Sequence, residues 1–147
     1  MYNPIYVSNN FLSRSFEQDV PVTSMKIQKM LYFLYRDYLK ATNIPIFSER
    51  FSTWKYGPVL ESVYYTYKKY GDTRIMTYGG SPPYKIKENS DPTLKKYLDD
   101  IWGKSLKHNG ISLSQLTHQK GSAWYDAWIT NDTFLQDTDI KNDNIEL

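Results

Sequence analysis

Apolar positions recur at three- and four-residue steps along much of the chain, which is the spacing of amphipathic helices. The clearest case covers residues 23–42. Its apolar face comprises Ile27, Met30, Leu31, Leu34, Tyr38 and Leu39. Thr23 or Ser24 can accept hydrogen bonds from the first free N–H groups, and Asn43 provides a stop after the last turn. The pattern therefore predicts one long helix in this segment.

Proline and glycine mark the borders of further helices. Pro58 directly after Gly57 predicts a helix start, because proline loses no hydrogen bond at the first helical position, and Gly71 ends that helix. Asp91 before Pro92 predicts another start, and Ser112 predicts a third as the first residue of a capping box. The predicted helices are residues 4–18, 23–42, 57–71, 91–107, 112–118 and 123–129.

Helices dominate this pattern, and we therefore expect a mainly α fold. It is predicted to be a compact single-domain helical bundle with a small β-hairpin or an irregular excursion around residues 73–87, where short extended runs flank glycines and prolines. The helical domain is expected to span residues 1–131, followed by an acidic C-terminal tail over residues 132–147. The acidic residues of the tail are Asp132, Asp137, Asp139, Asp143 and Glu146.

Composition narrows the class of protein. The chain has no cysteine, which excludes disulfides, thiolate metal sites and cysteine nucleophiles and favours a reducing compartment. Its net charge is +2 and its lysines are scattered in pairs, so direct nucleic-acid binding is not favoured. No signal peptide and no apolar run long enough to span a bilayer are found, and we expect a soluble protein in the cytoplasm, without a membrane partner.

Recognisable catalytic and cofactor motifs are missing from the sequence. It has neither a glycine-rich phosphate-binding loop nor a nucleophile elbow, and the spacing of His108 and His118 matches no common zinc site. The adjacent carboxylates of Asp99 and Asp100 point to different sides of a helix. We therefore predict no catalytic residue, no cofactor and no metal, and a protein that is not an enzyme. The competing hypothesis is a small enzyme that uses His118 with a nearby acid.

Two aromatic segments remain as candidates for binding. Gly57 and Pro58 restrict the backbone that presents Trp54 and Tyr56, which either pack under the following helix or contact a partner. His118 can donate to carbonyl oxygens of the loop around Trp54, as a satisfied buried polar group. The chain also has 14 tyrosines, more than one small core can bury, and exposed tyrosines favour protein contacts.

Several of these segments together resemble the Panacea (SocA-like) antitoxin domain family, which is common in bacterial toxin–antitoxin operons and phage genomes. Residues 26–33 (KIQKMLYF) resemble its KLQKLLYF helix, and residues 53–59 (TWKYGPV) resemble its AWKYGPV signature. Pro45-Ile46-Phe47 and Leu116-Thr117-His118 followed by Trp124 are similar to later elements in the same order. The resemblance covers residues 5–130.

The resemblance implies a non-enzymatic antitoxin that neutralises a cognate toxin by direct binding and that also acts, in some members, as a proteolytic adaptor. The partner is then a protein, either the toxin or a host defence protein. The residues expected to contact it are Trp54, Lys55, Tyr56, Tyr64, His118 and Trp124. The alternative is a phage-encoded anti-defence protein that inhibits a host nuclease or another immune complex, with the acidic tail as a nucleic-acid mimic.

Overall fold

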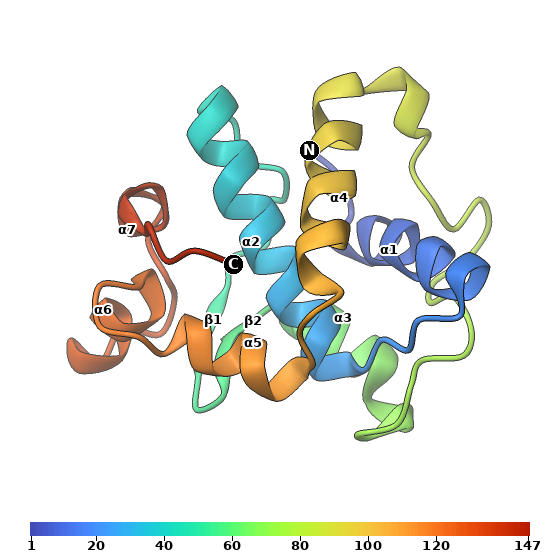
Figure 1. Cartoon of the computed structure of the whole chain (residues 1–147). Coiled ribbons are helices and arrows are strands. Elements are labelled where there is room, and N and C mark those ends of the chain that lie inside the picture. The colour runs from blue at the N-terminus through green and yellow to red at the C-terminus, as the bar shows by residue number, and fades with distance from the viewer.

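Helix α2 (Ser24–Thr42) runs through the middle of the molecule, and the other helices lie around it (Figure 1). The computed structural model describes all 147 residues. The side chain of Thr23 accepts a hydrogen bond from the Lys26 N–H, and Asn43 ends the helix in a left-handed conformation with its N–H bonded to the Leu39 oxygen. Both predicted ends of this helix are confirmed.

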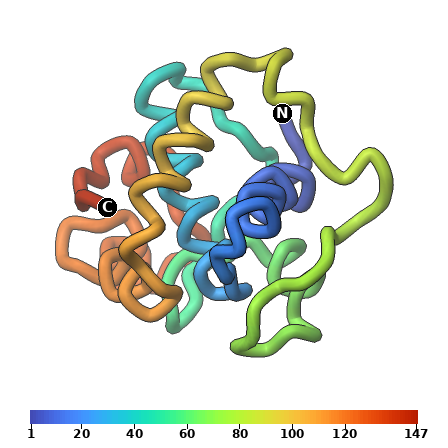
Figure 2. Tube along the Cα trace, turned by 45° about the vertical axis from the view of Figure 1, so that its right-hand side comes forward, coloured from blue at the N-terminus to red at the C-terminus, as the bar shows by residue number.

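One helix precedes α2 in the chain and the other elements follow it. They are α1 (Pro4–Gln18), β1 (Ser52–Trp54), β2 (Gly57–Val59), α3 (Glu61–Tyr67), η1 (Lys68–Tyr70), η2 (Glu88–Ser90), α4 (Pro92–Ser105), α5 (Gly110–Thr117), α6 (Ala123–Ile129) and α7 (Asp137–Asn142). Figure 2 shows the segment between α3 and α4, in yellow-green, running along the outer edge past α1. None of the helices has the length and apolar character needed to cross a membrane.

One hydrophobic core joins these elements. It takes Phe11 from α1, Leu31 from α2, Leu98 from α4, Leu113 from α5 and Trp124 from α6. The core is rich in aromatic rings: Tyr32 packs edge-on against Phe33 and Phe51, with ring centroids 5.4 and 5.5 Å apart. The mainly α fold is therefore confirmed, and it includes one small antiparallel strand pair, β1 with β2.

The place of that strand pair corrects part of the prediction. β1 pairs with β2, Thr53 opposite Pro58, so Pro58 lies in a strand and α3 begins only at Glu61. The predicted helix start at Gly57-Pro58 is wrong because Gly57 has φ 115°, which no helix contains, and because Leu60 is held extended by the side chain of Gln28.

The prediction for residues 73–87 is confirmed, and the predicted start of helix α5 is corrected. Residues 73–87 take the irregular form of the two predicted alternatives, with one isolated bridge between Thr23 and Arg74. Helix α5 begins at Gly110 and is capped by Asn109, while Ser112 supplies the returning half of the capping box. The capping box is present, but the predicted cap is off by three positions: Asn109 is the N-cap and Ser112 is the third residue of the helix.

Helix α7 was not predicted. It lies in residues 132–147, which the sequence marks as an acidic tail, and this segment contributes Leu135 and Ile140 to the core. The carboxylate of Asp143 is buried and accepts hydrogen bonds from Tyr32 and from the backbone of Ala123. The division of the chain at residue 131 stays a prediction.

Candidate functional site

The turn between β1 and β2, residues 54–57, is called the hairpin tip below. Gly57 closes it with φ 115°, and a Cβ atom there would lie 2.7 Å from the Thr117 hydroxyl and 3.0 Å from the Lys29 Cε. Only glycine combines this φ with so close an approach. The turn therefore packs directly against α2 and α5.

Three successive carbonyl oxygens of the hairpin tip accept hydrogen bonds from side chains of α5 and α6 and the turn between them. Trp124 Nε1 donates to the oxygen of Trp54 at 2.7 Å, His118 Nε2 lies 2.7 Å from that of Lys55, and Ser114 Oγ donates to that of Tyr56 at 2.6 Å. Backbone polar groups of a turn are usually left to water. Here they are tied to the helical body, which fixes the direction of the tip.

Helix α2 holds the strand that follows the tip. Lys29 Nζ donates to the Pro58 oxygen at 3.1 Å, while the amide of Gln28 bonds both the N–H and the carbonyl of Leu60, at 2.8 and 3.0 Å. The Lys29 side chain is only 1% exposed. Its burial lowers the pKa of the ammonium group to about 7.

His118 is fully engaged by the backbone. Its Nδ1 lies 2.5 Å from the Ser114 oxygen and its Nε2 2.7 Å from the Lys55 oxygen, so both ring nitrogens face backbone carbonyls. The ring also packs on Trp124 with centroids 4.0 Å apart. The expected donation from His118 to the loop around Trp54 is confirmed, and neither nitrogen is left free to exchange a proton with a substrate.

The residues expected to contact a partner fall into three groups. His118 and Trp124 lie behind the hairpin tip and hold its backbone. Tyr56, which is 59% exposed, and Lys55 project into solvent. Trp54 is half-buried and meets Tyr64 edge-on at a centroid distance of 4.9 Å, so it packs on α3 and still reaches the surface.

Two hollows lie on either side of Tyr56 and Met25, which line both. The first, called the Lys29 hollow, has a volume of about 560 Å³ and is lined by Ser24, Met25, Gln28, Lys29, Trp54, Lys55, Tyr56, Val59, Tyr64 and Gly71. The second, of about 740 Å³, is lined by residues of α5 together with His118. Neither lining contains an acidic side chain.

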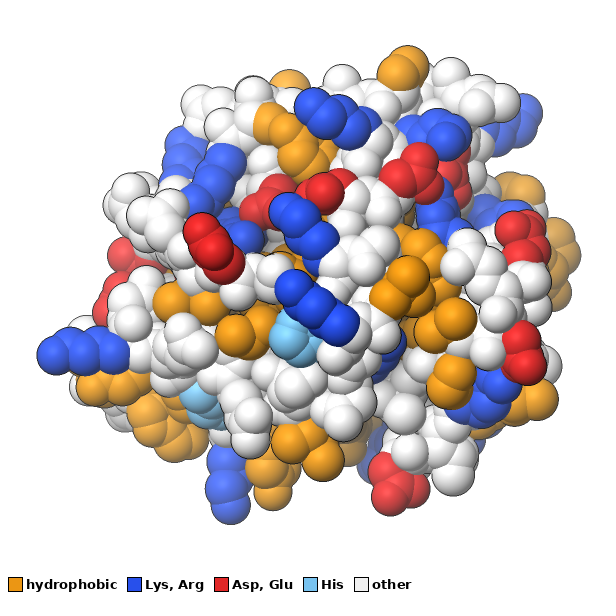
Figure 3. Space-filling view, in the orientation of Figure 1, with side chains coloured by type: hydrophobic (Ala, Val, Ile, Leu, Met, Phe, Trp, Pro, Cys, Tyr) orange, Lys and Arg blue, Asp and Glu red, His pale blue; other side chains and the backbone are white.

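Sequence reasoning missed Met25 and Ile111, which extend this surface. Met25 lies in the first turn of α2, and Ile111, in α5, is 65% exposed. The sequence feature that could have identified them is an apolar residue that lies outside the apolar stripe of its helix. Figure 3 shows hydrophobic side chains gathered along the lower part of the face, close to both histidines.

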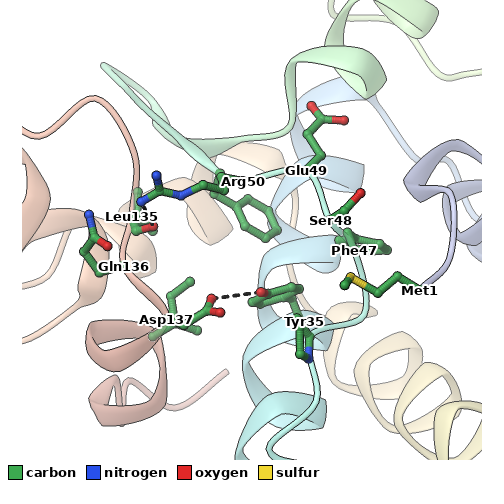
Figure 4. Close-up of a pocket in the computed structure, with 12 residues that line it drawn as sticks. Met1, Tyr35, Phe47, Ser48, Glu49, Arg50, Leu135, Gln136 and Asp137 are labelled. Carbon is green, nitrogen blue, oxygen red and sulfur yellow. Dashed lines mark hydrogen bonds between the residues drawn. The ribbon is translucent and has the colours of Figure 1, made fainter.

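A third hollow, of about 380 Å³, lies between α2, the segment after it and α7 (Figure 4). Several of its polar groups already have partners within the chain: Tyr35 donates to Asp137 at 2.8 Å, and Glu49 accepts from the backbone of Ser62. The Arg50 guanidinium lies over the ring of Phe134. The hairpin tip and its two hollows are therefore the stronger candidate site. No group of acidic and histidine side chains in the molecule is arranged to hold a metal ion.

Comparisons with known proteins bear on the same segments. A family model described as "Antitoxin SocA-like, Panacea domain" matches residues 27–125, more than half of the chain. Antitoxin SocA of Caulobacter vibrioides is 31% identical over 70 residues, 48% of this chain and 37% of that protein. The chain thus matches little more than a third of the length of its curated relative. No solved structure matches.

Proposed function

The chain belongs to the SocA-like antitoxin family with the Panacea domain, and on that premise we propose that it is a non-enzymatic antitoxin that neutralises a toxin by binding it directly through the hairpin tip. The toxin is a protein whose active surface the bound antitoxin covers. The single observation that carries the proposal is the fixing of three tip carbonyls by Trp124, His118 and Ser114.

Fixing the backbone in this way favours binding. A loop that is already ordered loses little conformational entropy when a partner docks, so more of the contact energy appears as affinity. The side chains that the tip presents, Trp54 and Tyr56, belong to the types that dominate interface energies. Lys55 adds a cation beside them, which can steer an acidic partner.

The family resemblance also implies delivery of the toxin to a protease, and the alternative hypothesis is a phage-encoded inhibitor of a host defence complex. Both stay predictions. In the alternative role the acidic tail mimics nucleic acid, yet Asp143 is buried and Asp137 accepts from Tyr35, so these two acids are engaged within the fold. Direct neutralisation through the hairpin tip therefore remains the leading proposal.

Co-expression with the product of the neighbouring gene tests the proposal. If that product arrests growth, the wild-type chain is expected to restore it, and Tyr56→Ser is expected to restore it less well at equal protein level. The matched control is Ile44→Ser. Ile44 is 56% exposed, close to Tyr56 in exposure, but follows the far end of α2.

The two variants separate a specific contact from a general loss of surface apolar area. Equal rescue by Tyr56→Ser and the wild-type chain would place the contact elsewhere. A neighbouring product that is harmless, or whose toxicity the wild-type chain leaves unchanged, would contradict the antitoxin role itself.

A further inference from the structure

Lys29 is a buried cation without a buried anion. Its side chain is 1% exposed, no carboxylate lies within 4.0 Å of its nitrogen, and its one hydrogen bond goes to the Pro58 oxygen. An ammonium group has three N–H donors, so two have no acceptor in the chain. A buried charge of this kind is costly unless a partner neutralises it.

The hollow that Lys29 lines has mainly uncharged walls. The other walls are largely apolar or aromatic, with Met25, Val59, Trp54 and Tyr56, and Lys55 is a second cation in the lining. No acidic side chain of the chain, which has 16 of them, lines the hollow. The hollow therefore combines apolar walls with an unneutralised positive group.

We propose that the Lys29 hollow receives a segment of the partner protein that sets an aspartate or glutamate carboxylate against the Lys29 ammonium group and packs an apolar side chain on Trp54 and Tyr56. This inference deepens the proposed function and rests on it for the identity of the partner as a toxin. A carboxylate offers two oxygens, which match the two unused N–H donors.

The contact with Lys29 is also expected to depend on pH. Because burial lowers the pKa of Lys29 to about 7, a part of the molecules carries a neutral amine near neutral pH. A carboxylate in the hollow favours the charged form, so binding takes up a proton. Affinity for the acidic segment is expected to weaken as the pH rises above 7.

Two capped dipeptides that differ only in charge test the proposal on the whole protein. N-acetyl-Leu-Glu-amide and N-acetyl-Leu-Gln-amide are titrated while the lysine Cε–Hε signals are followed by NMR. The glutamate peptide is expected to bind about tenfold more tightly, a ratio that corresponds to about 1.4 kcal/mol, and to shift the Lys29 signal. In Lys29→Met the preference should vanish, whereas the exposed Lys96→Met on α4 should keep it.

The other outcomes overturn the proposal. Equal binding of the two peptides, or no binding of either, rejects it on the wild-type chain alone, even if Lys29→Met does not fold. Sodium acetate that shifts Lys29 as strongly as the glutamate peptide indicates a small-anion site. A dimer in sedimentation that Lys29→Met converts to a monomer assigns the hollow to a second copy of the chain.

Failure of the carboxylate contact can be distinguished from failure of the antitoxin role. Peptide preference does not depend on the neighbouring gene product. If the wild-type chain and Lys29→Met rescue growth equally well, the antitoxin role holds and the carboxylate contact is rejected.

Discussion

The indole N–H of Trp124 donates to the carbonyl oxygen of Trp54 at 2.7 Å, although 70 positions separate the two residues in the chain. The Trp-Lys-Tyr-Gly-Pro-Val segment and the later Thr-His and Trp elements, far apart in sequence, thus form one structural unit around the hairpin tip. His118 and Ser114 complete it from α5 and its C-terminal end. Trp124, His118 and Ser114 each contact one of the three tip carbonyls, and these contacts join the two segments.

Replacing Trp124 with phenylalanine tests the importance of that bond. Trp124→Phe keeps an aromatic ring but leaves the Trp54 oxygen without its donor, which is expected to cost about 1 kcal/mol of unfolding free energy. Amide hydrogen exchange at the hairpin tip should become faster. The control is Trp102→Phe, which loses a bond from its indole N–H to Gln18 and should leave exchange at the tip unchanged. Equal exchange in both variants would contradict the role of Trp124.

Gly57 is expected to tolerate no side chain. Gly57→Ala combines a strained φ of 115° with a Cβ 2.7 Å from the Thr117 hydroxyl, and should lower the unfolding free energy by more than about 1 kcal/mol in urea denaturation. Gly121 has φ 96° and open space around it, so Gly121→Ala measures the cost of φ alone. A loss at Gly57 no larger than at Gly121 would show that close packing against Thr117 is unimportant.

Much of this arrangement was predictable because local chemistry determines it. Caps at Thr23 and Asp91 and the apolar stripe of α2 depend on neighbouring residues, and these helices were predicted within one residue at their starts. The strand at Pro58 was not predictable, since it depends on Gln28, 30 positions away, which bonds Leu60 and keeps the chain extended before α3.

The site was predictable in part for the same reason. Trp54 and Tyr56 were expected on a stiff turn, and Tyr56 is exposed there while Trp54 is half-buried. The burial of Lys29 could not be predicted, because a lysine in an amphipathic helix normally faces water. Only the fold shows that β2 covers it.

The buried Lys29 predicts a pH dependence of stability. Its pKa is about 7 in the folded protein and 10.5 when the side chain is exposed in the unfolded chain. Between these pH values the unfolded chain binds more protons, so the free energy of unfolding rises with pH. Lys29→Met should therefore flatten the rise in unfolding free energy between pH 7 and pH 9 relative to the wild-type chain. Lys96→Met, at an exposed position, should keep it. Parallel curves for the wild-type chain and Lys29→Met would contradict the lowered pKa.

Asp143 is expected to hold the C-terminal segment on the core. Its carboxylate is 1% exposed and accepts from Tyr32, from the Ala123 N–H and from Arg36, at 2.5, 3.2 and 3.4 Å. Asp143→Ala leaves the Tyr32 hydroxyl and the Ala123 N–H without their acceptor, while Arg36 keeps its ion pair with Asp37, and should cost about 3 kcal/mol in thermal or urea unfolding. The exposed Asp137, which accepts only from Tyr35, should cost about 1 kcal/mol when replaced by alanine.

A chain that ends at residue 131 tests the predicted domain boundary. It loses the buried side chains of Leu135 and Ile140 as well as the Asp143 bonds, and is expected to unfold at a clearly lower urea concentration than the whole chain. Unchanged stability of the shorter chain would show that residues 132–147 form a separate tail, as the sequence suggested.

If the toxin binds at the fixed hairpin tip, hydrogen exchange of the complex will detect it there. The purified chain is compared alone and with the toxic product of its neighbouring gene. Binding at the tip is expected to slow exchange at residues 54–57 and in the first turn of α2, and Tyr56→Ser is expected to weaken the complex. Protection confined to α1, α4 and the loop over residues 73–87, with the hairpin tip unchanged, would contradict it.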